Sequence, residues 1–155
     1  LGLERPSFGQ FARQVASIPL TELAAAMQAQ RETGGRLGNL LVERGLLTKD
    51  QIPEILTKQA EWVAASYQTD LGMSMPYPVF LSVCMPAYNE AENLPDTLDA
   101  ALAILPAFVD RFEVVVVDDG SKDDTAAVVR KYHEKDSRVR LVSHAQNGGY
   151  GAAVS

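Results

Sequence analysis

The chain has 155 residues, of which 46% are hydrophobic and 22% are charged, and it contains a single cysteine. This composition favours one domain of ordinary size or two small ones with a buried core, and it excludes an internal disulfide and a cysteine-based zinc site. The formal net charge of −6 argues against nucleic-acid binding through a basic surface, and no apolar run approaches the length of a membrane span.

An internal repeat occupies the N-terminal part of the chain. An offset of 29 residues superposes equivalent residues of the two copies: Gly9 on Gly38, Ile18 on Leu47 and Gln30 on Gln59. The apolar spacing in each copy predicts a short helix, a turn and a longer helix, with Gly45 in a left-handed conformation after a helix. Two copies predict a small all-α four-helix module over residues 1–67, and the aperiodic stretch 68–77 is predicted to be a linker.

Strands alternate with helices from residue 78 onward. VFLSVCM (79–85), FEVVVVDD (112–119) and VRLVSH (139–144) are predicted strands, and the first is expected to be buried with Cys84 in the core. Residues 92–105 and 123–135 have helical periodicity. This alternation predicts an α/β region over residues 78–155, with a Rossmann-like parallel sheet and helices on both of its faces.

Polar and aromatic residues follow the three predicted strands, at the edge where ligands of parallel sheets bind. Pro86 is expected to end the first strand, and Tyr88 then offers a flat aromatic face beside the polar side chain of Glu90. Asp118 and Asp119 leave the second strand on opposite faces, so that one can reach a ligand while the other bonds the loop. An Asp pair before Gly and Ser also suits any strand-to-helix turn, and Tyr88 alone could pack in the core. Together they indicate a nucleotide site.

The order VCMPAYNEAENL, EVVVVDDGSKDDT and RVRLVSHAQNGGYGAA resembles the start of a family-2 glycosyltransferase domain with the GT-A fold, particularly the transferases that use dolichol or polyprenyl phosphate. The likeness covers about residues 78–155, so it describes the N-terminal portion of such a domain. It implies that Tyr88 stacks on the base of a nucleotide-diphosphate sugar and that Asp119, with Asp118, bonds the base or ribose. It also implies a pocket shaped by Pro86, Ala87, Glu90 and the glycine-rich stretch that contains Gly149.

The resemblance further implies a divalent metal, Mg²⁺ or Mn²⁺, held by a later Asp-x-Asp motif, and a later carboxylate as general base. Neither has a counterpart before Ser155, so we expect no catalytic residue and no metal ligand in this chain, and a fragment that is inactive alone. The start at Leu1 and the end inside a glycine-rich stretch also suggest a piece of a longer protein. His133 and His144 are too isolated for a metal site and are expected to be solvated or structural.

The second repeat copy resembles the tandem motif in the N-terminal domain of type II secretion and type IV pilus ATPases, some of which bind cyclic di-GMP. The matching positions that would form a cyclic-dinucleotide half-site are Arg36, Leu37, Gly38, Leu41, Val42, Gly45, Leu46, Leu47 and Gln59. The first copy fits poorly, because Ser7 stands in place of the arginine and Arg13 in place of an aliphatic residue. A purely structural four-helix module is the alternative.

These observations predict a regulatory or targeting module joined to the donor-binding part of a glycosyltransferase. Its parent would transfer a sugar from a nucleotide-diphosphate donor to a polyprenyl phosphate or glycan acceptor, in the cytoplasm at the inner face of a membrane. The alternative from another class is a non-catalytic module that senses a cyclic dinucleotide or docks a partner. No nucleic-acid partner is expected.

Overall fold

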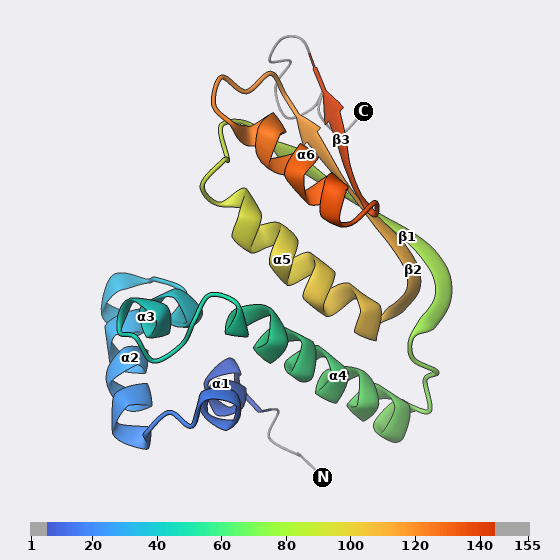
Figure 1. Ribbon diagram of the computed structural model, residues 1–155. Helices are drawn as coiled ribbons and strands as arrows, with labels where there is room; N and C mark the ends of the chain where they lie inside the picture. Colours follow the sequence, from blue (N-terminus) through green and yellow to red (C-terminus); the bar gives the residue numbers. More distant parts are fainter. Residues whose placement is uncertain (1–5, 145–155) are drawn as a thin grey trace. The chain divides into compact units, whose positions relative to one another are not determined.

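The computed structural model describes residues 6–144 and divides into two compact units, Leu1–Met75 and Pro76–Ser155 (Figure 1). The first unit is helical, and the second combines three strands with helices. Each has a hydrophobic cluster of its own.

The helical unit contains α1 (Phe8–Ala16), α2 (Leu20–Thr33), α3 (Leu37–Glu43) and α4 (Gln51–Leu71). Each repeat copy forms a short helix followed by a longer one, as the apolar spacing predicts. The end of the last helix differs from the prediction, because α4 continues four residues into the range 68–77 that was expected to be a linker. The helix ends only at Gly72, which has a left-handed φ of 65° and donates its N–H to the Gln68 carbonyl.

The two copies exchange their short helices: α1 packs against α4, and α3 packs against α2. The two equivalent glycines lie where α1 and α3 meet, and their contacts correspond. A Cβ on Gly9 would lie 3.2 Å from Leu23 and 3.5 Å from Leu37, and a Cβ on Gly38 would lie 3.4 Å from Ile52 and 3.3 Å from Phe8. Leu23 and Ile52 are equivalent residues, as are Leu37 and Phe8, so the same close packing occurs twice with the roles of the copies reversed. The module is therefore internally two-fold.

The helix ends of the two copies differ. Gly45 follows α3 with a φ of 70°, which confirms the predicted left-handed glycine. In the first copy the residue that ends α1 in the left-handed region is Ser17, with a φ of 52°. A residue with a Cβ is less stable than glycine in this conformation, so the first copy carries a small strain that the second lacks.

The second unit contains β1 (Tyr77–Ala87), α5 (Leu94–Ile104), a 3₁₀ turn η1 (Leu105–Ala107), β2 (Val109–Asp118), α6 (Thr125–Lys135) and β3 (Val139–Ser143). The strands form a parallel sheet in the order β1-β2-β3, as predicted. β1 continues through Pro86 to Ala87, so the proline does not end the strand as expected. Its missing N–H is tolerated because β1 lies at the edge of the described sheet.

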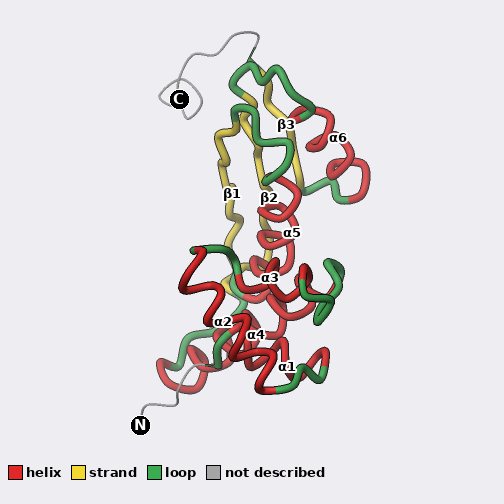
Figure 2. Tube along the Cα trace, turned by 90° about the vertical axis from the view of Figure 1, so that its left-hand side faces the viewer, coloured by secondary structure: helices red, strands yellow, loops and turns green. Residues whose placement is uncertain are grey.

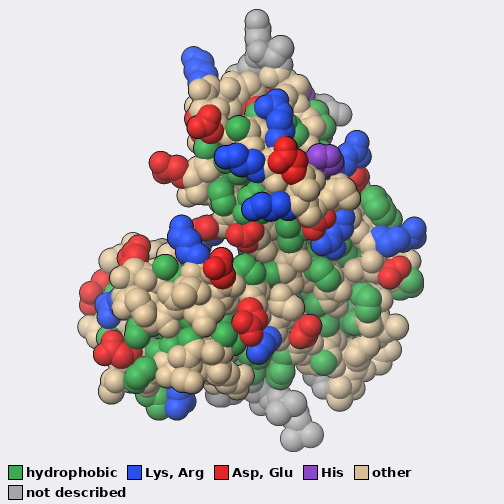
Figure 3. Space-filling view, viewed as in Figure 1, with side chains coloured by type: hydrophobic (Ala, Val, Ile, Leu, Met, Phe, Trp, Pro, Cys, Tyr) green, Lys and Arg blue, Asp and Glu red, His purple; other side chains and the backbone are tan. Residues whose placement is uncertain are grey.

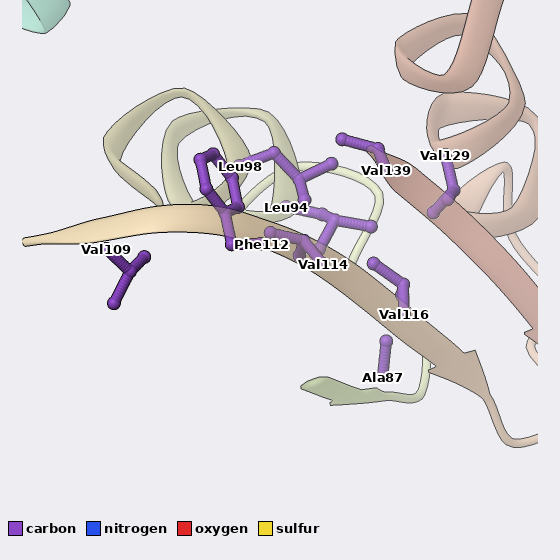
Figure 4. Packing of buried hydrophobic residues seen from close by; sticks show 9 residues of the cluster. All are labelled: Ala87, Leu94, Leu98, Val109, Phe112, Val114, Val116, Val129 and Val139. Atoms are coloured by element: carbon purple, nitrogen blue, oxygen red, sulfur yellow. The ribbon is translucent and has the colours of Figure 1, made fainter. Parts of the chain in front are cut away.

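Both helices of this unit pack on the same face of the sheet. Phe112, Val114 and Val116 alternate along β2 and form one cluster with residues of α5 and α6 (Figure 4). The cluster comprises Ala87, Leu94, Leu98, Val109, Phe112, Val114, Val116, Val129 and Val139. Figure 2 shows α5 and α6 on one side of the strands. The expectation of helices on both faces is therefore wrong for the described residues, because strand and helix alternation does not specify which face each crossover covers.

The opposite face is partly exposed along β1, and the prediction of a buried first strand with a core Cys84 is also wrong. Cys84 is exposed, and so is Phe80. A polar row crosses this face, where the Glu113 carboxylate accepts hydrogen bonds from the Ser82 hydroxyl (2.7 Å) and from Arg140 (3.0 Å). The pKa of Glu113 is held below its ordinary value by these two bonds, and the bond from Ser82 has the larger effect.

Candidate functional site

The carboxyl ends of the three strands lie next to one another in register. Ala87 pairs with Asp118, and Asp118 pairs with Ser143. Past these pairs, the Asp119 N–H donates to the Ala87 carbonyl (3.0 Å), and the His144 N–H donates to the Asp118 carbonyl (2.8 Å). The strand ends therefore bring together the segments that follow them, as a parallel sheet requires.

The two adjacent aspartates are both buried but have different surroundings, with exposed fractions of 4% for Asp118 and 5% for Asp119. The Asp118 carboxylate accepts the Ser121 N–H at 3.0 Å and so holds the turn at Gly120, whose φ is 75°. Asp119 Oδ1 lies 3.3 Å from Nδ1 of His144. Asp118 thus bonds the loop, as expected for one member of the pair, and Asp119 faces the neighbouring strand end.

Tyr88 follows β1 with 42% of its surface exposed, so it does not pack in the core. The next residue, Asn89, has a left-handed φ of 55°. Its backbone N–H donates to the Ser121 hydroxyl, and its side-chain oxygen accepts the Lys122 N–H, both at 2.9 Å. These two bonds join the loop after β1 to the loop after β2, and they fix the backbone beside Tyr88.

A second pair of side chains joins the same two loops. Thr125 is fully buried, and its hydroxyl accepts the Glu90 N–H at 2.9 Å and donates to the Asp123 carboxylate. Asp123 also accepts the N–H groups of Ala91 (3.1 Å) and Thr125 (3.0 Å). The hydrogen bond from the Thr125 hydroxyl and these backbone bonds hold the pKa of Asp123 below its ordinary value. Asp123 is therefore a bridge between loops.

The remaining predicted nucleotide-site residues are placed around these bonds. Pro86 is exposed on β1, and Ala87 is buried at its end. The Glu90 carboxylate accepts a hydrogen bond from the Asn93 side chain (3.0 Å), and the Glu90 carbonyl accepts the Leu94 N–H at the start of α5. The structure thus brings Pro86, Ala87, Tyr88, Glu90, Asp118 and Asp119 to one edge, while Gly149 lies outside the described residues.

Sequence reasoning missed five residues of this edge: Asn89 and Asp123 as bridges, Ser121 and Thr125 as their partners, and His144 beside Asp119. His144 was expected to be solvated or structural. The signal that could have found it is its position. When the second and third strands are parallel neighbours, the residue that follows the third strand lies beside the residue that follows the second. The bridging bonds join residues more than 30 positions apart, and nothing in the local sequence indicates them.

The residues predicted to form a cyclic-dinucleotide half-site lie mainly inside the helical module. Leu41 and Leu47 are buried, and Leu37, Val42 and Leu46 pack against the same cluster. Gly38 is buried between Phe8 and Ile52. The Gln59 amide donates to the Pro6 carbonyl at 3.5 Å, and Arg36, before α3, is exposed. Most of the apolar surface expected to meet a ligand is thus engaged by the module itself.

The described residues do not fit the divalent metal that the glycosyltransferase resemblance implies. Between residues 6 and 144, no group of three or more His, Cys, Asp or Glu side chains could hold a metal ion. We therefore assign no role to a metal in what these residues do. In the same part of the chain, no helix has the length and hydropathy needed to cross a membrane.

Comparison with known proteins gives a family match within the second unit. Residues 82–155 match the model of the Glycosyl transferase family 2. The match starts within β1 and includes the segments that follow all three strands. It bears out the resemblance to that family, whereas the helical module lies outside the matched range.

Several curated proteins are similar to this chain in sequence. A dolichyl-phosphate beta-glucosyltransferase of Dictyostelium discoideum is 43% identical over 83 residues, which is 49% of this chain and 25% of that protein. The human protein of that name is 45% identical over 83 residues, covering 48% of this chain and 25% of its own length. An undecaprenyl-phosphate 4-deoxy-4-formamido-L-arabinose transferase of Pseudomonas savastanoi is 40% identical over 77 residues, covering 49% and 23%. The chain thus spans about a quarter of these relatives.

One solved structure also resembles the chain. It is a mannosyltransferase from Pyrobaculum calidifontis in complex with GDP-Man and Mn²⁺, with 27% sequence identity and a TM-score of 0.44. The alignment covers 67% of this chain and 31% of that one.

Proposed function

We propose that the second unit is the nucleoside-binding part of a family 2 glycosyltransferase whose whole protein, with the GT-A fold, transfers a sugar from a nucleotide-diphosphate donor to a polyprenyl phosphate. The observation that carries the proposal is the juxtaposition of an exposed Tyr88 with the buried carboxylate of Asp119 at the carboxyl edge of a parallel sheet. The family match and the names of the relatives supply the reaction class.

In this proposal Tyr88 stacks on the base, and Asp119 accepts a hydrogen bond from the base or the ribose. An aromatic face suits a flat ring, and a carboxylate suits the N–H and O–H donors of a nucleoside. His144 orients Asp119, because its ring nitrogen lies 3.3 Å from the carboxylate. The bridges through Asn89 and Asp123 keep the loop that carries Tyr88 at a fixed place relative to Asp119.

The described residues would bind and orient the donor, and none is assigned a bond-making step. In the transfer itself, an acceptor phosphate oxygen bonds to the anomeric carbon as the bond to the nucleoside diphosphate breaks. A polyprenyl phosphate acceptor would place the parent protein at a membrane face, with the nucleotide site on the cytoplasmic side.

For the helical module we propose a packing or partner-docking role. The observation that favours it is the burial of Leu41, Leu47 and Gly38 in contacts that recur in both copies. Binding of cyclic di-GMP at Arg36 is the alternative, and a calorimetric titration of the chain with cyclic di-GMP distinguishes the two. A flat titration at high micromolar concentration supports the packing role, and saturable heat that Arg36→Ala abolishes supports the alternative.

The nucleotide proposal is tested by titrating the chain with UDP-glucose and GDP-mannose, which differ in their base, and following backbone amides by NMR. We expect one of them to shift amides in the loops after β1, β2 and β3. Asp119→Asn and Tyr88→Ala should each weaken binding about 5- to 150-fold, since a lost buried hydrogen bond or stacking contact costs about 1–3 kcal/mol.

Asp110→Asn is the matched control, because Asp110 lies on β2 near its amino end and is exposed. It should leave the affinity unchanged. Equal loss in Asp119→Asn and Asp110→Asn, or shifts confined to another part of the chain, would contradict the assignment of the site.

A further inference from the structure

A second site candidate lies away from the carboxyl edge, between the C-terminal half of α6 and the beginning of β3. It is a surface pocket of about 280 Å³ lined by Arg130 and His133 of α6 and by Arg140 and Leu141 of β3. Arg130 and His133 are three residues apart and so share one face of the helix. The volume is near the lower limit of small-molecule pockets, and a phosphate group with a few attached atoms would fill it.

The charge of this region is opposite to that of the chain. The chain has a net charge of −6, with seven Lys and Arg residues after position 75, of which five lie between residues 130 and 140. That segment holds only two acidic residues, Glu134 and Asp136, and Asp136 is paired with Arg138 at 2.6 Å. Figure 3 shows Lys and Arg side chains gathered on the face that carries α6.

Both guanidinium groups that line the pocket have donors to spare. Within residues 6–144, the guanidinium of Arg130 has no acidic partner. Arg140 uses Nη1 on Glu113, at 3.0 Å, and its side chain is 61% exposed. His133 Nδ1 lies 2.7 Å from the Val139 carbonyl, so this nitrogen must be the donor. That bond holds the ring in place, and in the neutral ring it makes Nε2 an acceptor, so the donors of the pocket come from the two arginines.

We propose that this pocket binds a phosphate group, through Arg130 and Arg140 with His133 as a fixed polar neighbour. Guanidinium groups match the oxygens of phosphate in charge and geometry, and Leu141 offers an apolar contact for whatever carbon chain bears the phosphate. The phosphate can belong to a soluble phosphate ester or to a lipid headgroup, since the chemistry is the same. The proposal does not depend on the nucleotide site, which lies at the other end of β3.

The test uses the whole chain and two probes. NMR titration with inorganic phosphate and glycerol 3-phosphate reports the soluble source, and sedimentation with phosphatidylcholine vesicles, with and without phosphatidylglycerol, reports the headgroup source. We expect amide shifts in α6 and β3 in the first assay or phosphatidylglycerol-dependent sedimentation in the second. Arg130→Gln should weaken binding of the probe about tenfold or more, because it removes one charge-assisted contact to the phosphate.

Lys131→Gln is the matched control, because it removes the same charge from the next residue of α6, which does not line the pocket. It should change binding less than about twofold if the pocket is specific. Equal losses in the two variants would show general electrostatic attraction and overturn the proposal. Absence of binding to both probes, or shifts confined to the loops of Tyr88 and Asp119, would overturn it as well.

Discussion

Thr125→Val tests whether the hydrogen bonds between the two loops hold the candidate site together. Valine has nearly the shape of threonine, so the fully buried side chain should leave no cavity. The variant loses the bond from the Glu90 N–H and the bond to the Asp123 carboxylate. The first loss leaves a partly buried N–H without a partner, which costs about 1–3 kcal/mol, and the second removes a bond to an exposed carboxylate that water can replace.

We therefore expect Thr125→Val to lower the free energy of unfolding of the second unit by about 1–3 kcal/mol. Hydrogen exchange of the amides of Val114 and Val116, in the core of that unit, measures the change. Trp62, the one tryptophan of the chain, lies in the helical unit, so its fluorescence should show an unchanged unfolding transition there.

Thr97→Val is the control for the same chemical change. Its hydroxyl donates to the Asn93 carbonyl one turn back in α5, at 3.1 Å, and joins no second loop. This substitution should cost less than about 0.5 kcal/mol. If the two variants destabilise equally, or Thr125→Val has no measurable effect, the bridging bonds do not organise this edge and the reasoning fails.

Three further predictions concern the helix ends, the carboxylates and the reaction. Ser17→Gly should stabilise the helical unit by about 0.5–1 kcal/mol and Gly45→Ser should destabilise it by about 1 kcal/mol in urea denaturation, because both positions have a left-handed φ. Hydrogen bonds lower the pKa values of Glu113, Asp123 and Asp136, so the stability that these carboxylates contribute is complete above the ordinary carboxyl pKa of about 4 and is lost as the pH falls through the lowered values. Acid titration followed by circular dichroism should therefore show that the second unit unfolds more readily below about pH 4. A flat profile in that range would contradict this prediction. The chain alone should transfer no sugar from UDP-glucose or GDP-mannose to a polyprenyl phosphate, with Mg²⁺ or Mn²⁺ present, and any turnover would refute that.

The order of the elements and the edge that carries Tyr88 and Asp119 could be predicted, because hydrophobic periodicity and strand alternation are local properties. The exposure of Cys84 could not, since an apolar run does not reveal that its strand lies at the edge of the described sheet. The length of α4 was underestimated because its last residues have little helical periodicity, although Gly72 provides the actual end.

The bonds of Asn89 and Asp123 could not be predicted for a different reason. Each residue type is common in turns, where it would bond its own loop. Here Asn89 has a left-handed backbone and its side chain bonds another loop, while Asp123 bonds both its own loop and the loop after β1. Which choice is made depends on how close the strand ends bring the two loops, and that is a property of the folded sheet.

The exchange of short helices in the helical unit has a consequence for how its two halves depend on each other. Because α1 packs mainly on α4 and α3 mainly on α2, each copy relies on the other to cover its long helix. A cut between Gly34 and Gly35, which join the copies, would leave two pieces that each expose an apolar face complementary to the other. The unit is therefore a natural candidate for reconstitution from two chains, with the close contacts at Gly9 and Gly38 setting the fit between them.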